Sequence, residues 1–320
     1  MTRIIRPYPG FIIPPRRFVD VGMPRSGVTM SGRYQIRVLD AYGIEKRRTP
    51  WFDNIILDSG LNRWGSGTII GGAAIGTSST TPAASDTGLG TQSHFTSTAG
   101  VGANLAAGTS PNYNNTRTFV YRTTLGALNG NYTEVGVGWA SGSMFSRALI
   151  LDGGGTPTSL SVSSSEQLDI FYQLSVYPPI VDIGPTTVTI SGVNYDVTGR
   201  SSYVSNISQV WTVGQGQVVF TSSGGFSQFV YAGPLGLITA GPSGAGATGG
   251  TIATSAYVNN SLEANGTWTY ALDSGNVSGG IGASFAGSSL GAFQYQFSPV
   301  IPKNNTKTLV LNYRQGWARR

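Results

Sequence analysis

The chain has 320 residues, of which 39% are hydrophobic and 11% are charged, with 46 glycines and no cysteine. This length allows a large core and usually more than one domain, and the low charge with ample aromatic residues excludes a solvated, disordered polymer. The lack of cysteine excludes disulfides and thiolate metal sites.

The charges are segregated along the chain. Residues 1–50 hold ten Lys and Arg against three acids, residues 301–320 hold five against none, and the segment between them holds five against eleven. Basic ends on a weakly acidic middle favour docking on an acidic protein surface, including another copy of the chain. We find no nucleic-acid-binding module and no long apolar or export segment, so we expect no specific nucleic-acid partner and no membrane partner.

Residues 1–33 are predicted to form an extended basic arm, because four prolines in the first fifteen residues disfavour both a helix and a central strand. We assign residues 1–49 to this arm and a first strand at 34–42. The arm is predicted to anchor the protein to a partner through arginines that supply charge and aromatic side chains that fill apolar pockets. These residues are Arg3, Arg6, Tyr8, Phe11, Arg16, Arg17, Phe18 and Arg25. A disordered basic tail is the alternative.

The rest of the chain has the pattern of an all-β protein. After one or two helical turns within 54–64, strands are predicted at 72–76, 118–123, 134–140, 143–151 and 168–177. The last is the clearest, because its apolar residues recur at every second position. Pro178-Pro179 marks the predicted boundary between an N-terminal domain, 50–180, and a C-terminal domain, 181–320. Short strands separated by Gly, Ser and Asn turns make each domain a predicted β-sandwich or jelly roll.

Motifs for catalysis are weak. Residues 287–291 match G-x-S-x-G, but no histidine follows Ser289, and the one histidine, His94, has no cysteine or second histidine with which to bind zinc. The carboxylates that could form a glycosidase pair do not cluster in sequence: Glu134, Glu166, Asp169, Asp182 and Asp196. Strand-edge or turn roles suit Glu134 and Glu166, and Asp169 should face away from the apolar side of its strand. We therefore expect no catalytic residue, no metal and no cofactor, with a glycan hydrolase as an alternative.

Several segments resemble a group of tailed-bacteriophage virion structural proteins. They include WFDNIILDSGL at 51–61, the segments 75–89, 134–151 and 157–179, TVTISGVNY at 187–195, and IPKNNTKTLVLNYRQGW at 301–317. The resemblance implies a β-rich, non-enzymatic component of the tail, tail fibre or collar. It would be made in the host bacterial cytoplasm and located in the virion, with other copies of itself and other virion proteins as partners.

Two alternatives stay open. A host-surface adhesin would bind glycan through exposed aromatic rings, for which Trp211, Trp268 and Tyr270 are the candidates; the same residues could instead belong to a sandwich core. A capsid decoration or head-fibre protein would differ from a tail protein in its copy number on the particle.

Overall fold

The computed structural model describes residues 18–190, 192–206, 216–220 and 229–320, with side chains from residue 22 onward. Within these residues the chain forms 23 strands and one short helix, α1 (Asp58–Trp64), so the protein is all-β. No helix in the described part of the chain has the length and hydropathy that crossing a membrane requires.

The largest sheet has ten strands and draws them from both halves of the chain. We call it the long sheet. Its path runs β19 (Thr251–Thr254), β20 (Glu263–Tyr270), β23 (Thr308–Arg319), β2 (Ser26–Asp40), β14 (Glu166–Tyr177), β9 (Asn115–Arg122) and β8 (Asn104–Ala107). Three further strands pair with this path, β1 (Phe18–Gly22) with β23, and β3 (Glu45–Arg48) and β4 (Phe52–Asp53) with β2.

Three smaller sheets complete the fold. A five-stranded sheet has the order β5 (Ile55–Ile56), β12 (Ser143–Leu149), β11 (Glu134–Ala140), β6 (Gly72–Gly76) and β7 (Gln92–Thr96). A six-stranded sheet has the order β15 (Ile183–Ile190), β16 (Val193–Ser202), β22 (Gly291–Ile301), β21 (Ile281–Ser288), β17 (Val230–Tyr231) and β18 (Gly246–Ala247). The third sheet pairs β10 (Gly130–Tyr132) with β13 (Leu160–Val162).

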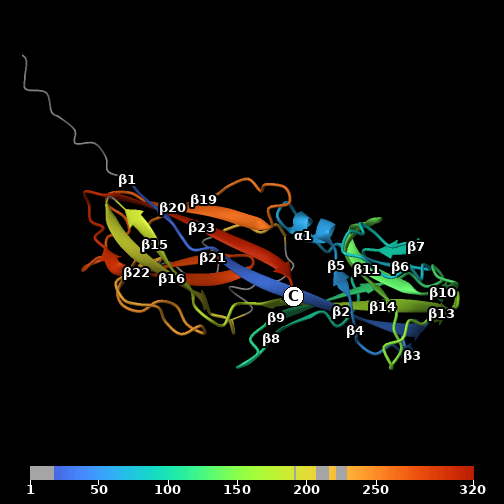
Figure 1. Ribbon diagram of the computed structural model, residues 1–320. Coiled ribbons are helices and arrows are strands. Elements are labelled where there is room, and N and C mark those ends of the chain that lie inside the picture. Colours follow the sequence, from blue (N-terminus) through green and yellow to red (C-terminus); the bar gives the residue numbers. More distant parts are fainter. Residues whose placement is uncertain (1–17, 191, 207–215, 221–228) are drawn as a thin grey trace, which may run out of the picture.

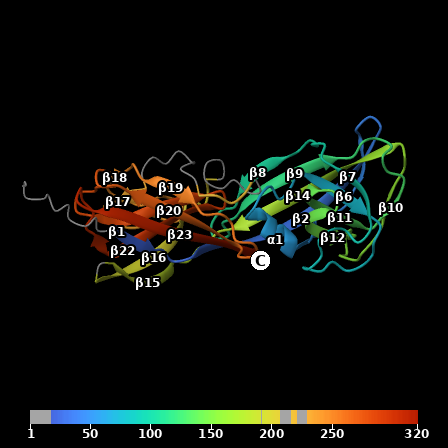
Figure 2. The same cartoon turned by 90° about the horizontal axis from the view of Figure 1, so that it is seen from above.

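The sheets form an elongated molecule with two lobes (Figures 1 and 2). In the N-terminal lobe the long sheet faces the five-stranded sheet, and Tyr34 on β2 donates a hydrogen bond to the Ser146 carbonyl on β12. In the C-terminal lobe it faces the six-stranded sheet, where the rings of Tyr295 on β22 and Tyr313 on β23 lie 5.2 Å apart. Strands β2 and β23 run through the waist between the lobes, so one sheet serves both.

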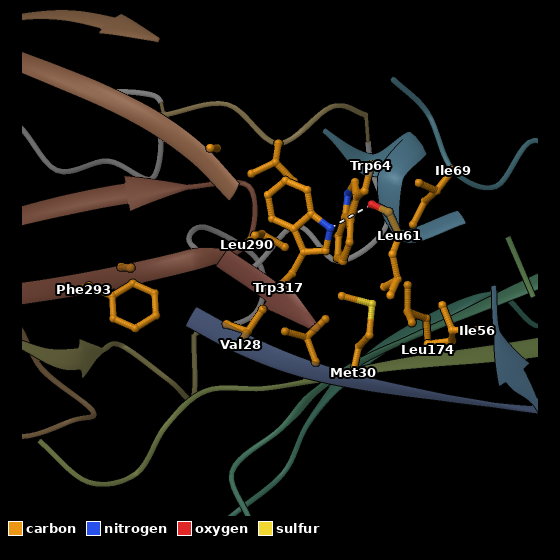
Figure 3. Packing of buried hydrophobic residues seen from close by; sticks show 14 of the residues in the cluster. Val28, Met30, Ile56, Leu61, Trp64, Ile69, Leu174, Leu290, Phe293 and Trp317 are labelled. Carbon is orange, nitrogen blue, oxygen red and sulfur yellow. Dashed lines mark hydrogen bonds between the residues drawn. The ribbon is translucent and has the colours of Figure 1, made fainter. Parts of the chain in front are cut away.

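The hydrophobic core is also continuous through the waist (Figure 3). Trp317 on β23 packs edge-on against Trp64 of α1, with ring centroids 6.4 Å apart. Its indole Nε1 donates a 2.8 Å hydrogen bond to the Leu61 carbonyl. Because Trp317 is buried, this bond gives its N–H a partner that water cannot supply. The C-terminal strand is therefore fastened to the helix of the N-terminal lobe.

Most strands predicted in the first half of the chain are confirmed. β6 and β11 have the predicted bounds, while β9, β12 and β14 overlap the predicted segments and differ at their ends by a few residues. The helical turns predicted within 54–64 are α1. Pro178-Pro179 does separate β14 from β15, but the long sheet contains strands from both sides of this point.

The prediction of an arm over residues 1–33 is wrong for residues 18–33. β1 pairs in parallel with residues 308–312 of β23, and β2 begins at Ser26, where it pairs in parallel with residues 315–319 of the same strand. Further along, β2 pairs with β14 from Thr29 onward. β1 and the beginning of β2 are therefore strands of the body, because β23, which is far away in the sequence, pairs with their backbone groups, and β2 gains a second partner from Thr29 onward. Residues 1–17 lie outside the described residues.

Candidate functional site

Two of the five carboxylates considered as catalytic are held by arginines in the N-terminal lobe. Asp169 is completely buried and accepts bonds from Arg122 Nε at 2.7 Å and Arg37 Nη2 at 3.0 Å. Arg47 binds both oxygens of Glu166, at 2.9 and 3.0 Å, and this contact is the largest cause that lowers the pKa of Glu166 to about 2. Glu166 with this lowered pKa would make a poor general acid, and the oxygens of Asp169 are already taken up by arginine contacts.

Glu134 is buried at the start of β11, where it organises a loop. Its carboxylate accepts backbone N–H bonds from Thr91 at 2.7 Å, Gly90 at 2.9 Å and Ser78 at 3.2 Å. Arg147 on β12 adds a bond from Nε at 3.0 Å, and its own side chain is only 3% exposed. Through these contacts Glu134 cross-links β11, β12 and the loop before β7.

The remaining candidate carboxylates and the candidate serine nucleophile have structural contacts of their own. Asp182 forms a two-bond ion pair with Arg200, which lowers the pKa of Asp182, and Asp196 accepts a bond from Thr187 at 2.6 Å. Ser289 lies in the turn between β21 and β22, which is a hairpin rather than a strand-to-helix elbow. Among the described residues, no three Asp, Glu, His or Cys side chains gather as a metal site would require.

Two of the three aromatic residues assigned to glycan binding are not at the surface. Trp268 and Tyr270 are fully buried in the C-terminal lobe, where Trp268 packs against Phe220 and Tyr313 with centroid distances of 5.3 and 4.7 Å. A buried ring has no face free to stack on a sugar, so the adhesin assignment is wrong for these two residues. Trp211 lies outside the described residues.

Most residues predicted to anchor the protein fall in the segment before β1. The residues outside the described part are Arg3, Arg6, Tyr8, Phe11, Arg16 and Arg17. Phe18 is the first residue of β1, where only its backbone is described. The side chain of Arg25 lies in the body, where its Nε is 2.8 Å from Glu263 Oε2 on β20, so this arginine binds within its own chain.

A cavity of about 740 Å³ opens at the waist, and we call it the waist groove. It is bounded by the start of β2, the end of β23, the loop before β9 and the segment after β14. The residues that define it are Arg25, Thr29, Asn112–Asn114, Tyr177–Ile180, Gly316 and Arg320. Four segments that are distant in the sequence therefore meet around one opening.

Two arginines are the charged residues of this groove, and both are held in place. The Arg25 guanidinium lies across β23 at Gly316, where a Cβ atom would collide with it. Arg320 stacks on Tyr177, with the guanidinium carbon 4.0 Å from the ring centre, while its backbone N–H donates to the Met30 carbonyl at 2.8 Å. No Asp or Glu is among the described residues that line the groove.

Comparisons of this chain with protein-family models, curated proteins and solved structures find no match. A functional assignment therefore depends on the residues and geometry described above. The sequence indicated the basic character of both ends, but it contained no signal that Arg25 and Arg320 would line the same cavity.

Proposed function

We propose that this protein is a structural component of a tailed-phage virion, associated with the tail or collar, and that residues 1–17 attach it to neighbouring subunits. The observation that carries the proposal is the place where this basic segment joins the body. β1 begins at the end of the C-terminal lobe that lies away from the waist, beside Thr308 of β23 (Figure 1).

The composition of this segment suits attachment to a protein surface. Residues 1–17 contain four arginines, four prolines and no acid, together with Tyr8 and Phe11. Proline reduces the conformational freedom that binding must remove, and arginine and tyrosine are enriched where protein interfaces contribute most of their binding energy. A segment of this kind adds contact area at one end of an elongated body.

The body suits a structural role because its carboxylates serve as internal cross-links. The buried acids Glu134, Glu166 and Asp169 are each bound by at least one arginine. In this proposal the two lobes are β-sandwich units joined by the long sheet, which would keep their relative orientation fixed under load. Low surface charge favours extensive contacts with other copies and other virion proteins.

The decisive experiment removes residues 2–17 and measures incorporation into particles. We expect the truncated protein to keep its circular dichroism spectrum and thermal midpoint but to be lost from purified virions, as measured by quantitative mass spectrometry. The cut must end at residue 17, because a longer deletion would remove β1 and part of β2.

A charge-matched pair of variants identifies the physical cause. Replacing Arg3, Arg6, Arg16 and Arg17 by Gln should abolish incorporation, whereas replacing the same four residues by Lys should retain most of it. Normal incorporation of the deletion variant would refute the proposal. Copy number and position of the protein on the particle would separate a tail or collar protein from a capsid decoration protein.

A further inference from the structure

The waist groove has the electrostatic character of an anion-binding site. Among its described lining residues the two charged side chains are Arg25 and Arg320, and no acid is present. Glu263 offsets part of the Arg25 charge from outside the lining, through one bond to Nε. The guanidinium of Arg320 stacks on Tyr177 and forms no ion pair with a described residue. An anion that enters the groove would meet two guanidinium groups, that of Arg320 and the partly neutralised one of Arg25.

Both guanidinium groups are positioned before any ligand arrives. The bond to Glu263 uses Arg25 Nε and leaves the Nη atoms for another acceptor. Stacking on Tyr177 fixes the plane of Arg320 in a similar way, and its five donors lie at the edge of that plane. Planar, preoriented guanidinium groups match carboxylates by paired hydrogen bonds.

The rest of the lining offers neutral polar groups beside apolar surfaces. The Thr29 hydroxyl and the Asn112 amide make no side-chain hydrogen bond within the described residues, so both could bind ligand hydroxyls. Pro178, Pro179 and half-exposed Ile180 supply the apolar part. Hydroxyl partners next to apolar faces suit a sugar ring, which has polar edges and C–H faces.

The size and backbone of the groove favour a saccharide over a peptide. A volume of about 740 Å³ lies within the range for small-ligand sites. At Gly316, strand β23 is already paired with β20 on one side and with β2 on the other, so this strand has no free edge to which a peptide could add. The neighbouring prolines offer no backbone N–H.

We propose that the waist groove binds an acidic oligosaccharide, with carboxylates bound by Arg25 and Arg320 and ring hydroxyls by Thr29 and Asn112. The described residues that line this site include neither Trp268 nor Tyr270. It does not depend on the proposed role in assembly, so either proposal can fail while the other holds.

The test is calorimetric titration of the full chain with tetragalacturonate and with sialyllactose. Binding of at least one of them at millimolar concentration is expected. If tetragalacturonate binds, its methyl ester, which has the same rings without charge, should bind at least about tenfold more weakly, and lactose serves as the neutral control for sialyllactose. Arg25→Ala and Arg320→Ala should each weaken binding about tenfold, since each removes a charge-assisted contact.

Arg314→Ala is the matched control. Arg314 is exposed on the same strand but outside the groove lining, so its loss changes the net charge equally and should leave binding unchanged. Thermal melts of every variant verify folding, and Arg320→Lys, which keeps the charge but loses the planar fork, should bind with intermediate affinity. Failure of both acidic sugars to bind, equal binding of the neutral controls, or an equal loss in Arg314→Ala would overturn the proposal.

Discussion

Arg25 reaches across β23 to Glu263 on β20, with Nε 2.8 Å from Oε2, although 238 residues separate the two in the chain. Gly316 makes this possible, because a side chain at that position would occupy the space of the guanidinium. The contact ties the residue that precedes β2 to the start of β20, and Arg25 also lines the waist groove.

Gly316→Ala should therefore uncouple Arg25 from Glu263 with little loss of stability. The Arg25 side chain is 53% exposed, so it can move into solvent, and exposed ion pairs contribute about 0–1 kcal/mol. A double-mutant cycle of Arg25→Ala and Glu263→Gln, measured by urea unfolding, should give a coupling energy in the native background and none in the Gly316→Ala background. A coupling energy that is unchanged by Gly316→Ala would contradict this reading.

Glu134→Ala should be among the most destabilising single substitutions in the N-terminal lobe. It would leave the buried Arg147 without its closest buried acid and three backbone N–H groups without their acceptor, and we expect a loss of about 3–5 kcal/mol. Glu134→Gln keeps one acceptor oxygen and should lose less. Arg48→Ala, which breaks an exposed pair with Glu45, is the control and should leave the denaturation midpoint almost unchanged, because solvent screens this pair.

Glu166 should contribute to a loss of stability in acid. Its folded pKa of about 2 is below the ordinary value of 4.5, so the stabilisation is complete above pH 4.5 and disappears as the pH falls through 2. Unfolding free energies measured from pH 5 to pH 2 should therefore decline less steeply in Glu166→Gln than in the native protein. Arg47→Gln should raise the pKa of Glu166 toward its ordinary value, which a carboxyl NMR titration would detect; an unchanged pKa would rule out Arg47 as the cause.

The two possible N-terminal truncations should behave differently. Removing residues 2–17 leaves every described strand intact, whereas removing residues 2–33 deletes β1 and eight residues of β2 from the middle of the long sheet. We expect the shorter truncation to melt close to the native temperature and the longer one to aggregate or to lose its cooperative transition. Equal melting temperatures would show that β1 and the beginning of β2 are dispensable to the fold.

Much of the architecture followed from local patterns. The alternation in β14 located this strand and correctly put Asp169 opposite its apolar face, as Leu168 and Ile170 point into the core. The burial of Asp169 could not be predicted in this way. It depends on Arg37 and Arg122 from the two adjacent strands, and on a loop in which Gly100 lies close to its carboxylate.

The aromatic residues show a second limit of local patterns. In β20, alternation places Trp268 and Tyr270 on the same face, but the sequence does not indicate whether that face is covered. The six-stranded sheet covers it, through side chains such as Tyr295 that pack on neighbouring Tyr313. The sequence was equally consistent with a surface and a core location for Trp268 and Tyr270, and the packing of the two sheets decided that they lie in the core.

The sequence by itself determined the all-β class, many strand positions and the concentration of basic residues at both ends, because these depend on side-chain period, turn residues and charge. Only the tertiary structure decided that residues 18–33 belong to the body and that Arg25 and Arg320 line one groove. Both outcomes result from the parallel pairing of β1 and β2 with β23, whose paired residues are about 290 positions apart in the chain. Such a register depends on hydrogen bonds and burial between distant segments, which no local pattern specifies.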